Sequence, residues 1–335
     1  MILVTGGTGL VGAHLLLQLL KQGQKVRAIH RRNSDIQRVK KIFGYEGETS
    51  LNLFHKIEWT EADINDITQL ETSFKGVERV YHAAAFISFD PGDYQKLHKI
   101  NTEGTANIVN LCIAHKIKKL CYVSTIGAIG KSLNGNQADE ENVWTSQDAN
   151  VYALTKHAAE MEVWRGSQEG LNVVMVNPGV IIGPGFWNSG SGSLFGVAKK
   201  EHSFYPPGGT GFITISDVVK MMVALMESDI KNERFIAVAE NLSYQQILTK
   251  ITTALGLKPP TKELKQWQLE LGRWFDWLRN LIFNTGRRIT KNSVKSLKNR
   301  EIYSNEKAKN VLQFKFEPLE PTITFCSQKF LEENP

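Results

Sequence analysis

A tyrosine and a lysine stand four residues apart in the segment Tyr152-Ala153-Leu154-Thr155-Lys156. Because four residues make about one turn of an α-helix, both side chains would project from the same helix face. An ammonium beside a phenol favours the phenolate and brings its alkaline pKa closer to working pH. The pair could therefore move a proton at a reacting carbonyl, with Tyr152 as the acid and Lys156 as its partner. The same spacing also occurs on ordinary helix surfaces, so the pair by itself does not identify a catalytic site.

A glycine-rich turn near the N-terminus is a second motif, and together the two motifs indicate a dinucleotide-dependent enzyme. The apolar residues 2–4 lead into the sequence TGGTGLVG at positions 5–12, and an apolar helical segment follows. Gly6 permits a tight turn, Gly9 lets backbone N–H groups approach a pyrophosphate, and Gly12 lets helix and strand pack closely. The positive end of the helix would then face the phosphates. The pattern predicts a dinucleotide site that contains Gly6, Thr8, Gly9, Leu10, Val11 and Gly12.

The elements that must position these residues alternate between strand and helix over residues 1–180. Segments rich in Val, Ile and aromatic residues occur at 25–30, 56–59, 79–83, 119–124 and 171–177, separated by stretches of helical length. This alternation predicts an α/β fold with a doubly wound parallel sheet, the Rossmann arrangement. After Pro178 the chain becomes irregular and rich in Gly and Pro. We therefore predict a dinucleotide-binding domain at 1–180 and a smaller, mainly substrate-binding region at 181–335, with some segments returning to the first core.

The order of these motifs resembles the extended short-chain dehydrogenase/reductase family, which includes NAD-dependent epimerase/dehydratases, dihydroflavonol reductases and 3β-hydroxysteroid dehydrogenases. The resemblance covers nearly the whole chain. It also includes Asn101 on a helix, the strand end Tyr122-Val123-Ser124-Thr125 and the segment 177–184. It implies cofactor contacts by Tyr152 and Lys156, by Asp63 and Ile64 near the adenine, and by Ala83, Ala84, Ala85, Pro178, Gly179 and Val180.

The resemblance implies a third catalytic group, a hydroxyl at the end of the fifth strand. Thr125, rather than Ser124, occupies the position of the family's catalytic serine. Tyr152 would give its proton to the developing alkoxide, while Lys156 would hold the nicotinamide ribose and stabilise the phenolate. Asn101 has two interpretations, a tie between the helix backbone and the active site or a helix N-cap.

The end of the second strand bears on the choice of cofactor. An acid that bonds the ribose hydroxyls is typical of NAD sites, but this chain has His30-Arg31-Arg32 there. Two guanidiniums suit a 2′-phosphate, so NADP is favoured and NAD is the alternative. Under the other interpretation both arginines are solvated, with Asp35 as their surface partner.

The substrate is expected to be a small molecule, and the segments around the nicotinamide end are apolar. We expect Phe86, Phe186 and Trp187 to line that end. The segment 211–219 keeps Asp217 but lacks the preceding arginine of nucleotide-sugar enzymes. These features favour a reductase or alcohol dehydrogenase for a mid-sized, partly apolar substrate. A nucleotide-sugar epimerase/dehydratase is the first alternative, and a non-catalytic nucleotide-sensing protein is the second.

The amino-acid composition bears on disulfides, metal binding, location and partners. The 335 residues contain only three cysteines and eight histidines, with no His-x-x-x-His pair, so we expect neither a disulfide framework nor a metal site. The first strand begins at Met1 and no long apolar stretch is evident, which makes cytoplasmic the expected location. After residue 256 there are 15 Lys and Arg against 9 Asp and Glu. No nucleic-acid motif accompanies this positive charge, so we expect no nucleic-acid partner. The sequence leaves open whether the protein forms a homodimer.

One further segment carries helical periodicity. From Leu264 to Phe283, apolar residues recur at steps of three and four and form one stripe. The favoured interpretation is that this stripe packs on the protein's own core or covers the pocket as a lid. A partner helix or an interfacial membrane contact is the alternative, and the basic run from Arg287 to Arg300 follows directly.

Overall fold

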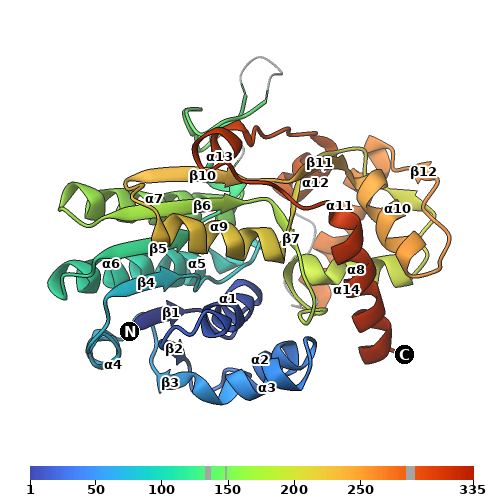
Figure 1. Ribbon diagram of the computed structural model, residues 1–335. Helices are drawn as coiled ribbons and strands as arrows, with labels where there is room; N and C mark the ends of the chain where they lie inside the picture. The colour runs from blue at the N-terminus through green and yellow to red at the C-terminus, as the bar shows by residue number, and fades with distance from the viewer. Residues whose placement is uncertain (133–136, 148, 284–290) are drawn as a thin grey trace.

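The computed structural model describes residues 1–132, 137–147, 149–283 and 291–335. Its main body is a parallel sheet with helices on both faces (Figure 1). The strands are β1 (Ile2–Thr5), β2 (Val26–His30), β3 (Glu58–Glu61), β4 (Arg79–His82), β5 (Lys119–Val123), β6 (Val173–Pro178) and β10 (Glu233–Ala237). Their order in the sheet is β10-β6-β5-β4-β1-β2-β3. This order confirms the predicted doubly wound α/β fold.

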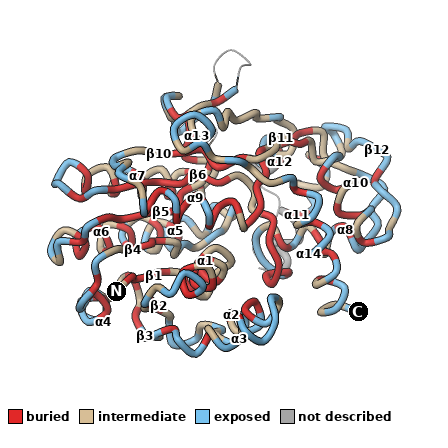
Figure 2. The backbone as a smooth tube through the Cα atoms, in the orientation of Figure 1, coloured by how far each residue is buried: buried red, intermediate tan, exposed pale blue. Residues whose placement is uncertain are grey.

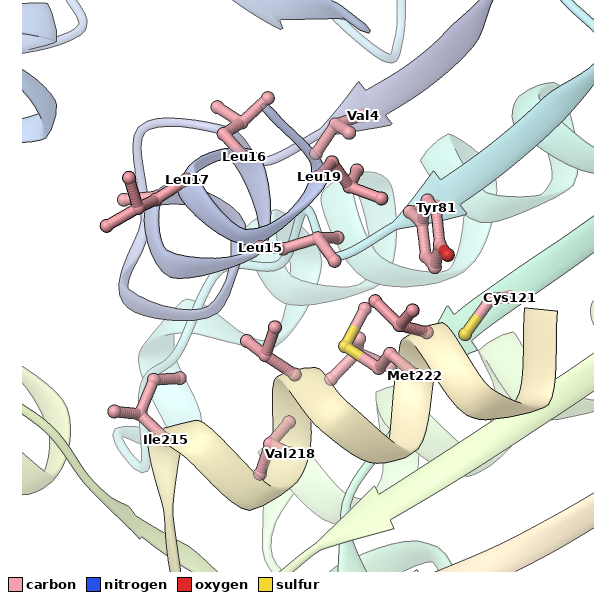
Figure 3. Packing of buried hydrophobic residues seen from close by; sticks show 14 of the residues in the cluster. Val4, Leu15, Leu16, Leu17, Leu19, Tyr81, Cys121, Ile215, Val218 and Met222 are labelled. Atoms are coloured by element: carbon pink, nitrogen blue, oxygen red, sulfur yellow. The ribbon is translucent and has the colours of Figure 1, made fainter. Parts of the chain in front are cut away.

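Two layers of helices bury the two faces of this sheet. One layer consists of α1 (Leu10–Lys21), α2 (Ile36–Gly44) and α9 (Ile215–Glu227), and the other of α4 (Ile67–Ser73), α6 (Gly104–Ala114) and α7 (Val151–Gln168). Figure 3 shows leucines of α1 and Met222 of α9 beside Tyr81 of β4 and Cys121 of β5. Because both faces are covered, β1, β5 and β6 are buried along their whole length, as Figure 2 shows in red.

The rest of the chain forms a smaller unit beside the carboxyl ends of the strands. Its strands are β7 (Val180–Ile182), β8 (Phe204–Tyr205), β9 (Gly209–Thr214), β11 (Glu240–Ser243) and β12 (Lys262–Glu263). Its helices are α8 (Ser193–Lys199), α10 (Tyr244–Ala254), α11 (Gln266–Phe283), α12 (Lys291–Lys298) and α14 (Leu319–Glu333). Helix α13 (Glu306–Val311) instead packs on β10 of the main sheet. Phe195, Ile247 and Ile323 join α8, α10 and α14 in one apolar cluster. Although α9 and β10 come after residue 180, they pack on and extend the main sheet.

The short elements complete the connections. They are α3 (Glu48–Leu53) and α5 (Tyr94–Leu97), the 3₁₀ turns 54–56, 91–93, 126–128 and 190–192, and a π-helical turn at His98–Glu103. That π-turn continues without a break into α6, a geometry that often marks functional positions in helices.

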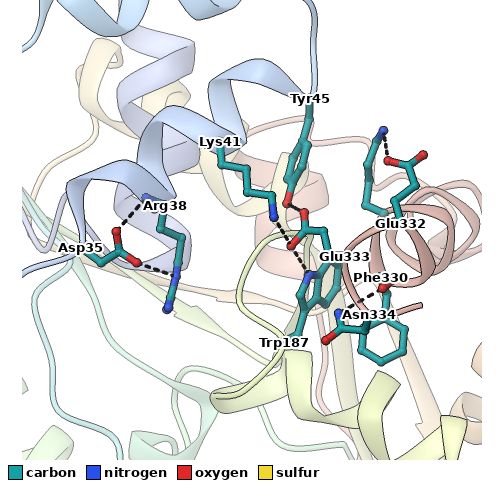
Figure 4. Close-up of polar contacts among 10 residues, drawn as sticks. Asp35, Arg38, Lys41, Tyr45, Trp187, Phe330, Glu332, Glu333 and Asn334 are labelled. Carbon is teal, nitrogen blue, oxygen red and sulfur yellow. Dashed lines mark hydrogen bonds and ion pairs between the residues drawn. The ribbon is translucent and has the colours of Figure 1, made fainter.

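The C-terminal helix is bonded to α2 across the two units (Figure 4). The carboxylate of Glu333 lies 2.8 Å from Lys41 Nζ and accepts a hydrogen bond of 2.8 Å from Trp187 Nε1. The hydroxyl of Tyr45 donates to the same carboxylate. This contact connects the helix that follows the second strand with the end of the chain.

The stripe on α11 does not pack on the protein's own core. The side chains of Trp267, Leu271, Trp274 and Phe275 are between 47% and 61% exposed. The prediction of a core-packed stripe or pocket lid is therefore wrong for these four residues, because the helix turns its opposite side inward. The side chains of the stripe members Leu278, Leu281 and Ile282 are not among those that the structure describes, and Arg287 and Arg288 of the basic run lie outside the described residues. None of the described helices combines the length and apolar composition needed to cross a bilayer.

Candidate active site

The turn between β1 and α1 has the shape that a dinucleotide requires. Gly6 has a φ of +69°, and a Cβ there would lie 2.6 Å from the backbone of Ala83 and Ala84. A Cβ on Gly12 would lie 2.2 Å from the carbonyl oxygen of Gly6. Both positions therefore exclude any larger residue, since the helix start, the turn and the end of β4 are in contact.

The N-terminus of α1 is free of competing anions. Gly9 is the N-cap, no side chain caps the helix, and no acidic residue occupies its first turn. The backbone N–H groups of Leu10 and Val11 begin this helix, and Thr8 precedes it. A phosphate fits this arrangement because it would satisfy the unpaired N–H groups and the positive end of the helix dipole.

Arg31 and Arg32 follow β2 with exposed side chains, close in sequence to this turn. Asp35 caps α2 at Arg38 N and its carboxylate lies 3.5 Å from Arg38 Nε (Figure 4). Asp35 is therefore the partner of Arg38, and the alternative in which it pairs with the two preceding arginines is wrong. Within the described part of the chain, Arg31 and Arg32 form no ion pair, which leaves both guanidiniums available to an anion.

The residues expected near the adenine and along β4 occupy the same end of the sheet. Asp63 Oδ1 accepts hydrogen bonds from Asn65 N and Nδ2, at 2.9 and 3.2 Å. Ile64 is buried against α6 at Gly104. Ala83 and Ala84 are held by hydrogen bonds from their N–H groups to Thr5, and Ala85 is exposed. Pro178 ends β6, Gly179 N donates to Ala237 O, and Val180 begins β7.

Lys156 is fully buried and directed at the fifth strand. Its Nζ lies 2.5 Å from the hydroxyl of Tyr122 and 2.8 Å from the carbonyl oxygen of Val123. Burial lowers the pKa of Lys156 to about 7, and the Glu160 carboxylate one helical turn later opposes this shift. The ammonium is thus oriented by β5, and its proton is held less tightly than that of a surface lysine.

Tyr152 lies at the start of the same helix, which begins at the N-cap Asn150. Its ring makes an edge contact with Phe89 at a centroid distance of 5.9 Å. Burial raises the pKa of Tyr152 above the ordinary value for a phenol. The prediction that Lys156 lowers this pKa is therefore wrong for this arrangement, because the ammonium donates to Tyr122 and Val123 instead.

Thr125 stands where β5 ends and a 3₁₀ turn begins. Its Oγ1 accepts a hydrogen bond of 3.2 Å from Gly127 N, and a Cβ on Gly127 would lie 3.4 Å from Ala153 of α7. The turn after Thr125 therefore packs directly on the first turn of the Tyr152 helix. Ser124, by contrast, is buried, and its hydroxyl lies beside the Glu160 carboxylate, where it acts to lower the pKa of that group against the effect of burial.

Behind these groups lies a buried polar network. Glu160 is fully buried and accepts a 2.6 Å hydrogen bond from Asn177 Nδ2, which also donates to the carbonyl oxygen of Thr125 at 3.0 Å. Arg234 of β10 approaches the other Glu160 oxygen at 3.3 Å. The network therefore joins α7, the end of β5 and β6 in one set of contacts.

Two further buried polar residues hold the neighbouring elements. His82 pairs with Thr5 Oγ1 at 2.6 Å and Thr105 Oγ1 at 2.9 Å, and burial lowers its pKa to about 3. Asn101 lies inside the π-turn, where it bonds both backbone groups of Phe86 and donates to Thr155 Oγ1 at 3.2 Å. Asn101 is thus a tie to α7 rather than an N-cap.

Three residues were expected at the nicotinamide end, and the structure separates them. Phe86 is partly exposed beneath Lys96 and is held by Asn101. Phe186 and Trp187 are buried in packing contacts, Phe186 beside Arg38 and Trp187 bonded to Glu333. Because these two side chains fill the junction with α2 and α14, we remove both from the candidate substrate site.

A cavity of about 150 Å³ adjoins the turn after Thr125. Gly127, Asn150 and Ala153 border it beside the candidate catalytic groups. Its other described lining residues are Ile126, Ile129, Gly130, Lys131, Trp144, Thr145, Gln147, Ala149, Gly209, Thr210, Tyr244, Lys295, Ser296, Asn299, Glu301 and Tyr303. The lining mixes apolar and aromatic side chains with hydroxyl and amide groups, and it carries the charged residues Lys131, Lys295 and Glu301. It includes no arginine among these residues.

Sequence reasoning missed several of these residues. Glu160 could have been found, because it continues the four-residue spacing of Tyr152 and Lys156. Tyr244 and Tyr303 carried no signal, since distant elements bring them to the cavity. No described group of His, Cys, Asp or Glu residues is arranged to hold a metal ion.

Comparison with known proteins gives consistent results. The model of the NAD dependent epimerase/dehydratase family matches residues 2–238. The chain is 31% identical over 260 residues to sterol demethylase protein B of Methylococcus capsulatus, covering 77% of this chain and 75% of that protein. It is 29% identical over 288 residues to a putative dihydroflavonol 4-reductase of Synechocystis, covering 83% of this chain and 78% of that protein.

Solved structures show the same fold over the full length. The crystal structure of gox2253 superposes with a TM-score of 0.83 at 25% identity, covering 100% of this chain and 98% of that one. UDP-glucose 4-epimerase of Thermotoga maritima superposes with a TM-score of 0.77 at 21% identity, covering 100% of this chain and 99% of that one. The glycine turn, the Tyr152 helix and these matches lead to one conclusion: the chain belongs to the NAD dependent epimerase/dehydratase family, and it is an enzyme of the extended short-chain dehydrogenase/reductase type.

Proposed function

We propose that this protein is an NADP-dependent carbonyl reductase or alcohol dehydrogenase for a mid-sized, partly apolar substrate. The cavity beside Gly127 and Ala153 carries this proposal. A nucleotide sugar brings a diphosphate that suits arginine forks, whereas the described lining contains no arginine. Its two lysines, Lys131 and Lys295, stand with the carboxylate of Glu301 and with apolar side chains such as Ile126, Ile129 and Trp144. Exposed Arg31 and Arg32 after β2 support NADP as the cofactor.

In this proposal the bound dinucleotide supplies the hydride and the protein manages the proton. The hydroxyl of Tyr152 donates its proton to the developing alkoxide, and the Thr125 hydroxyl donates a hydrogen bond to the same oxygen. The Lys156 ammonium, oriented by Tyr122 and Val123, holds the nicotinamide ribose. Gly6, Gly9 and the N-terminus of α1 hold the pyrophosphate. Asp63, Ile64, Ala83, Ala84, Pro178, Gly179 and Val180 complete the proposed cofactor contacts.

A panel of apolar ketones and nucleotide sugars, followed by NADPH absorbance, tests the proposal. We expect NADPH to be consumed with at least one ketone class, and Tyr152→Phe to abolish turnover while NADPH affinity is kept. Tightly held oxidised cofactor with interconversion of a nucleotide sugar would show an epimerase instead. Cofactor binding without turnover of either substrate class would favour a non-catalytic nucleotide-sensing protein.

A further inference from the structure

Helix α11 carries an apolar surface that faces away from the protein. With 3.6 residues per turn, its exposed large side chains fall along one side of the helix. Leu269 and Asp276, each only 7% exposed, fall on the opposite side and seat the helix on its neighbours. We call the exposed set the α11 ridge, and its members are Trp267, Leu271, Trp274 and Phe275.

The two-stranded sheet of β8 and β12, just before α11, carries a further exposed aromatic residue and a cation. Phe204 of β8 is 42% exposed, and β8 pairs with β12 just before α11 begins. The Nζ atom of Lys262 lies 5.9 Å from the centroid of the Phe204 ring. An aromatic ring beside an ammonium near the ridge combines the two side-chain types that bind at the headgroup level of a bilayer.

The positive charge of the chain is concentrated in the part of the sequence that contains this helix. Residues 257–300 contain eleven Lys and Arg and three Asp and Glu, whereas the rest of the chain contains twenty-nine and thirty-one. The net positive charge of the protein therefore resides in the segment that carries the ridge. A second copy docked through this segment would bring like charges together, whereas an anionic lipid surface would neutralise them.

Helix α11 is connected to the candidate substrate cavity through one neighbouring helix. Helix α11 packs against α12, and α12 contributes Lys295 and Ser296 to the cavity lining. A surface bound through α11 would therefore sit beside the wall of the cavity. We propose that the α11 ridge and its surrounding lysines form a docking surface for an anionic lipid bilayer. This inference rests on exposure and charge, so it does not depend on the proposed reaction.

Flotation of the purified full chain with lipid vesicles tests the proposal. One set of vesicles is phosphatidylcholine alone, and the other contains added phosphatidylglycerol. We expect binding to the anionic vesicles that weakens as salt is raised. The double variant Trp267→Ala/Trp274→Ala should reduce binding about tenfold or more, because apolar contact area is lost. The variant Lys262→Glu/Lys265→Glu should reduce it by removing cations.

A matched control separates the ridge from general surface hydrophobicity. Val143→Ser removes an apolar side chain that is 83% exposed elsewhere on the molecule, and it should leave vesicle binding unchanged. Failure of the full chain to float with anionic vesicles at low salt would overturn the proposal. Equal flotation of the double tryptophan variant would do so too. A dimer in sedimentation that the double variant dissociates, without vesicle binding, would assign the ridge to a second copy.

Discussion

Lys156 donates a hydrogen bond to the hydroxyl of Tyr122, 2.5 Å away, and both side chains are fully buried. The Lys156 Nζ also lies 4.2 Å from the centre of the Tyr122 ring, and that ring stacks on His82 at a centroid distance of 5.4 Å. The lysine of the Tyr152 helix is therefore oriented by a tyrosine from the fifth strand. Tyr122 is a positioning residue for the lysine, and this role can be tested separately from the acid Tyr152.

Replacing Tyr122 by phenylalanine should weaken both NADPH binding and turnover. The change removes the acceptor of a buried ammonium, a loss of about 1.5 to 3 kcal/mol, which corresponds to roughly tenfold or more in kcat/KM. Steady-state kinetics with NADPH measures the effect. The matched control is Tyr81→Phe, the same change at a buried tyrosine on the neighbouring strand, which should leave kcat/KM unchanged. Equal losses in both variants would show general destabilisation and refute the positioning role.

The hydroxyl that assists catalysis is assigned to Thr125, and the adjacent Ser124 provides the comparison. Thr125→Val should lower kcat at least about a hundredfold with little change in folding, because a hydrogen bond to developing charge is lost. Thr125→Ser should retain most of the activity. Ser124→Ala should retain it as well, since the Ser124 hydroxyl is buried behind the turn. A large loss with Ser124→Ala alone would reverse the assignment.

The pH dependence of the enzyme should report the charge on Lys156. Burial lowers the pKa of this lysine to about 7, and Glu160 opposes the shift. As pH rises through this pKa the ammonium is lost, so activity that needs it should decline on the alkaline side. Glu160→Gln removes the opposing charge, and the decline should move to lower pH by about one unit. The other groups facing Lys156 are Tyr122 and His82, and burial keeps His82 neutral by lowering its pKa to about 3.

The control for this experiment is Glu162→Gln. Glu162 lies on the same helix and pairs with Arg165 at 2.8 Å near the surface, so its removal should leave the pH profile of kcat/KM unchanged. A Glu160→Gln enzyme with a lower melting temperature and an unshifted profile would show that Glu160 acts only in folding.

The choice between NADP and NAD should depend on the two exposed arginines after β2. Arg31→Ala and Arg32→Ala should each raise the Kd for NADPH by about tenfold or more, because a guanidinium contact to the 2′-phosphate is lost. The Kd for NADH, measured on the same variants by fluorescence titration, should be nearly unchanged. Equal affinity for NADPH before and after both substitutions would remove NADP from the proposal.

The contact between α2 and α14 should stabilise the fold. Glu333→Gln removes the charge that Lys41, Tyr45 and Trp187 share, and the melting temperature should fall by roughly 2–6 °C at neutral pH. Burial opposes ionisation of Glu333, but its three donors lower its pKa overall. The carboxylate's contribution is thus present above its unfolded pKa and is lost as pH falls through its folded pKa.

The neighbouring residue serves as the comparison for that variant. Glu332→Gln changes an exposed carboxylate that pairs with Lys329, and it should alter the melting temperature little. At acid pH, where Glu333 of the wild type is protonated, the melting temperatures of the wild type and of both variants should become equal. A drop of equal size for both variants, or a Glu333→Gln effect that persists at acid pH, would contradict the assigned role.

The sequence by itself determined the sheet and the nucleotide turn, because their signals are local. Apolar runs bounded by turn residues predicted β1, β2, β4, β5 and β6 close to their observed positions, and β3 was predicted two residues early. Gly6 and Gly12 could be identified because a left-handed φ and a backbone contact exclude side chains whatever surrounds them. The four-residue spacing likewise placed Tyr152 and Lys156 on one helix.

Only the tertiary structure decided the partners of these residues. Lys156 bonds Tyr122, Asn177 links Glu160 to Thr125, and β10 returns from beyond residue 180 to complete the sheet. The inward side of α11 was likewise undecided, since a periodic stripe shows that a helix has an apolar side but not whether the fold covers it. Spacing fixes which side chains share an element, whereas burial, ion pairing and pKa depend on what other elements bring within a few ångströms.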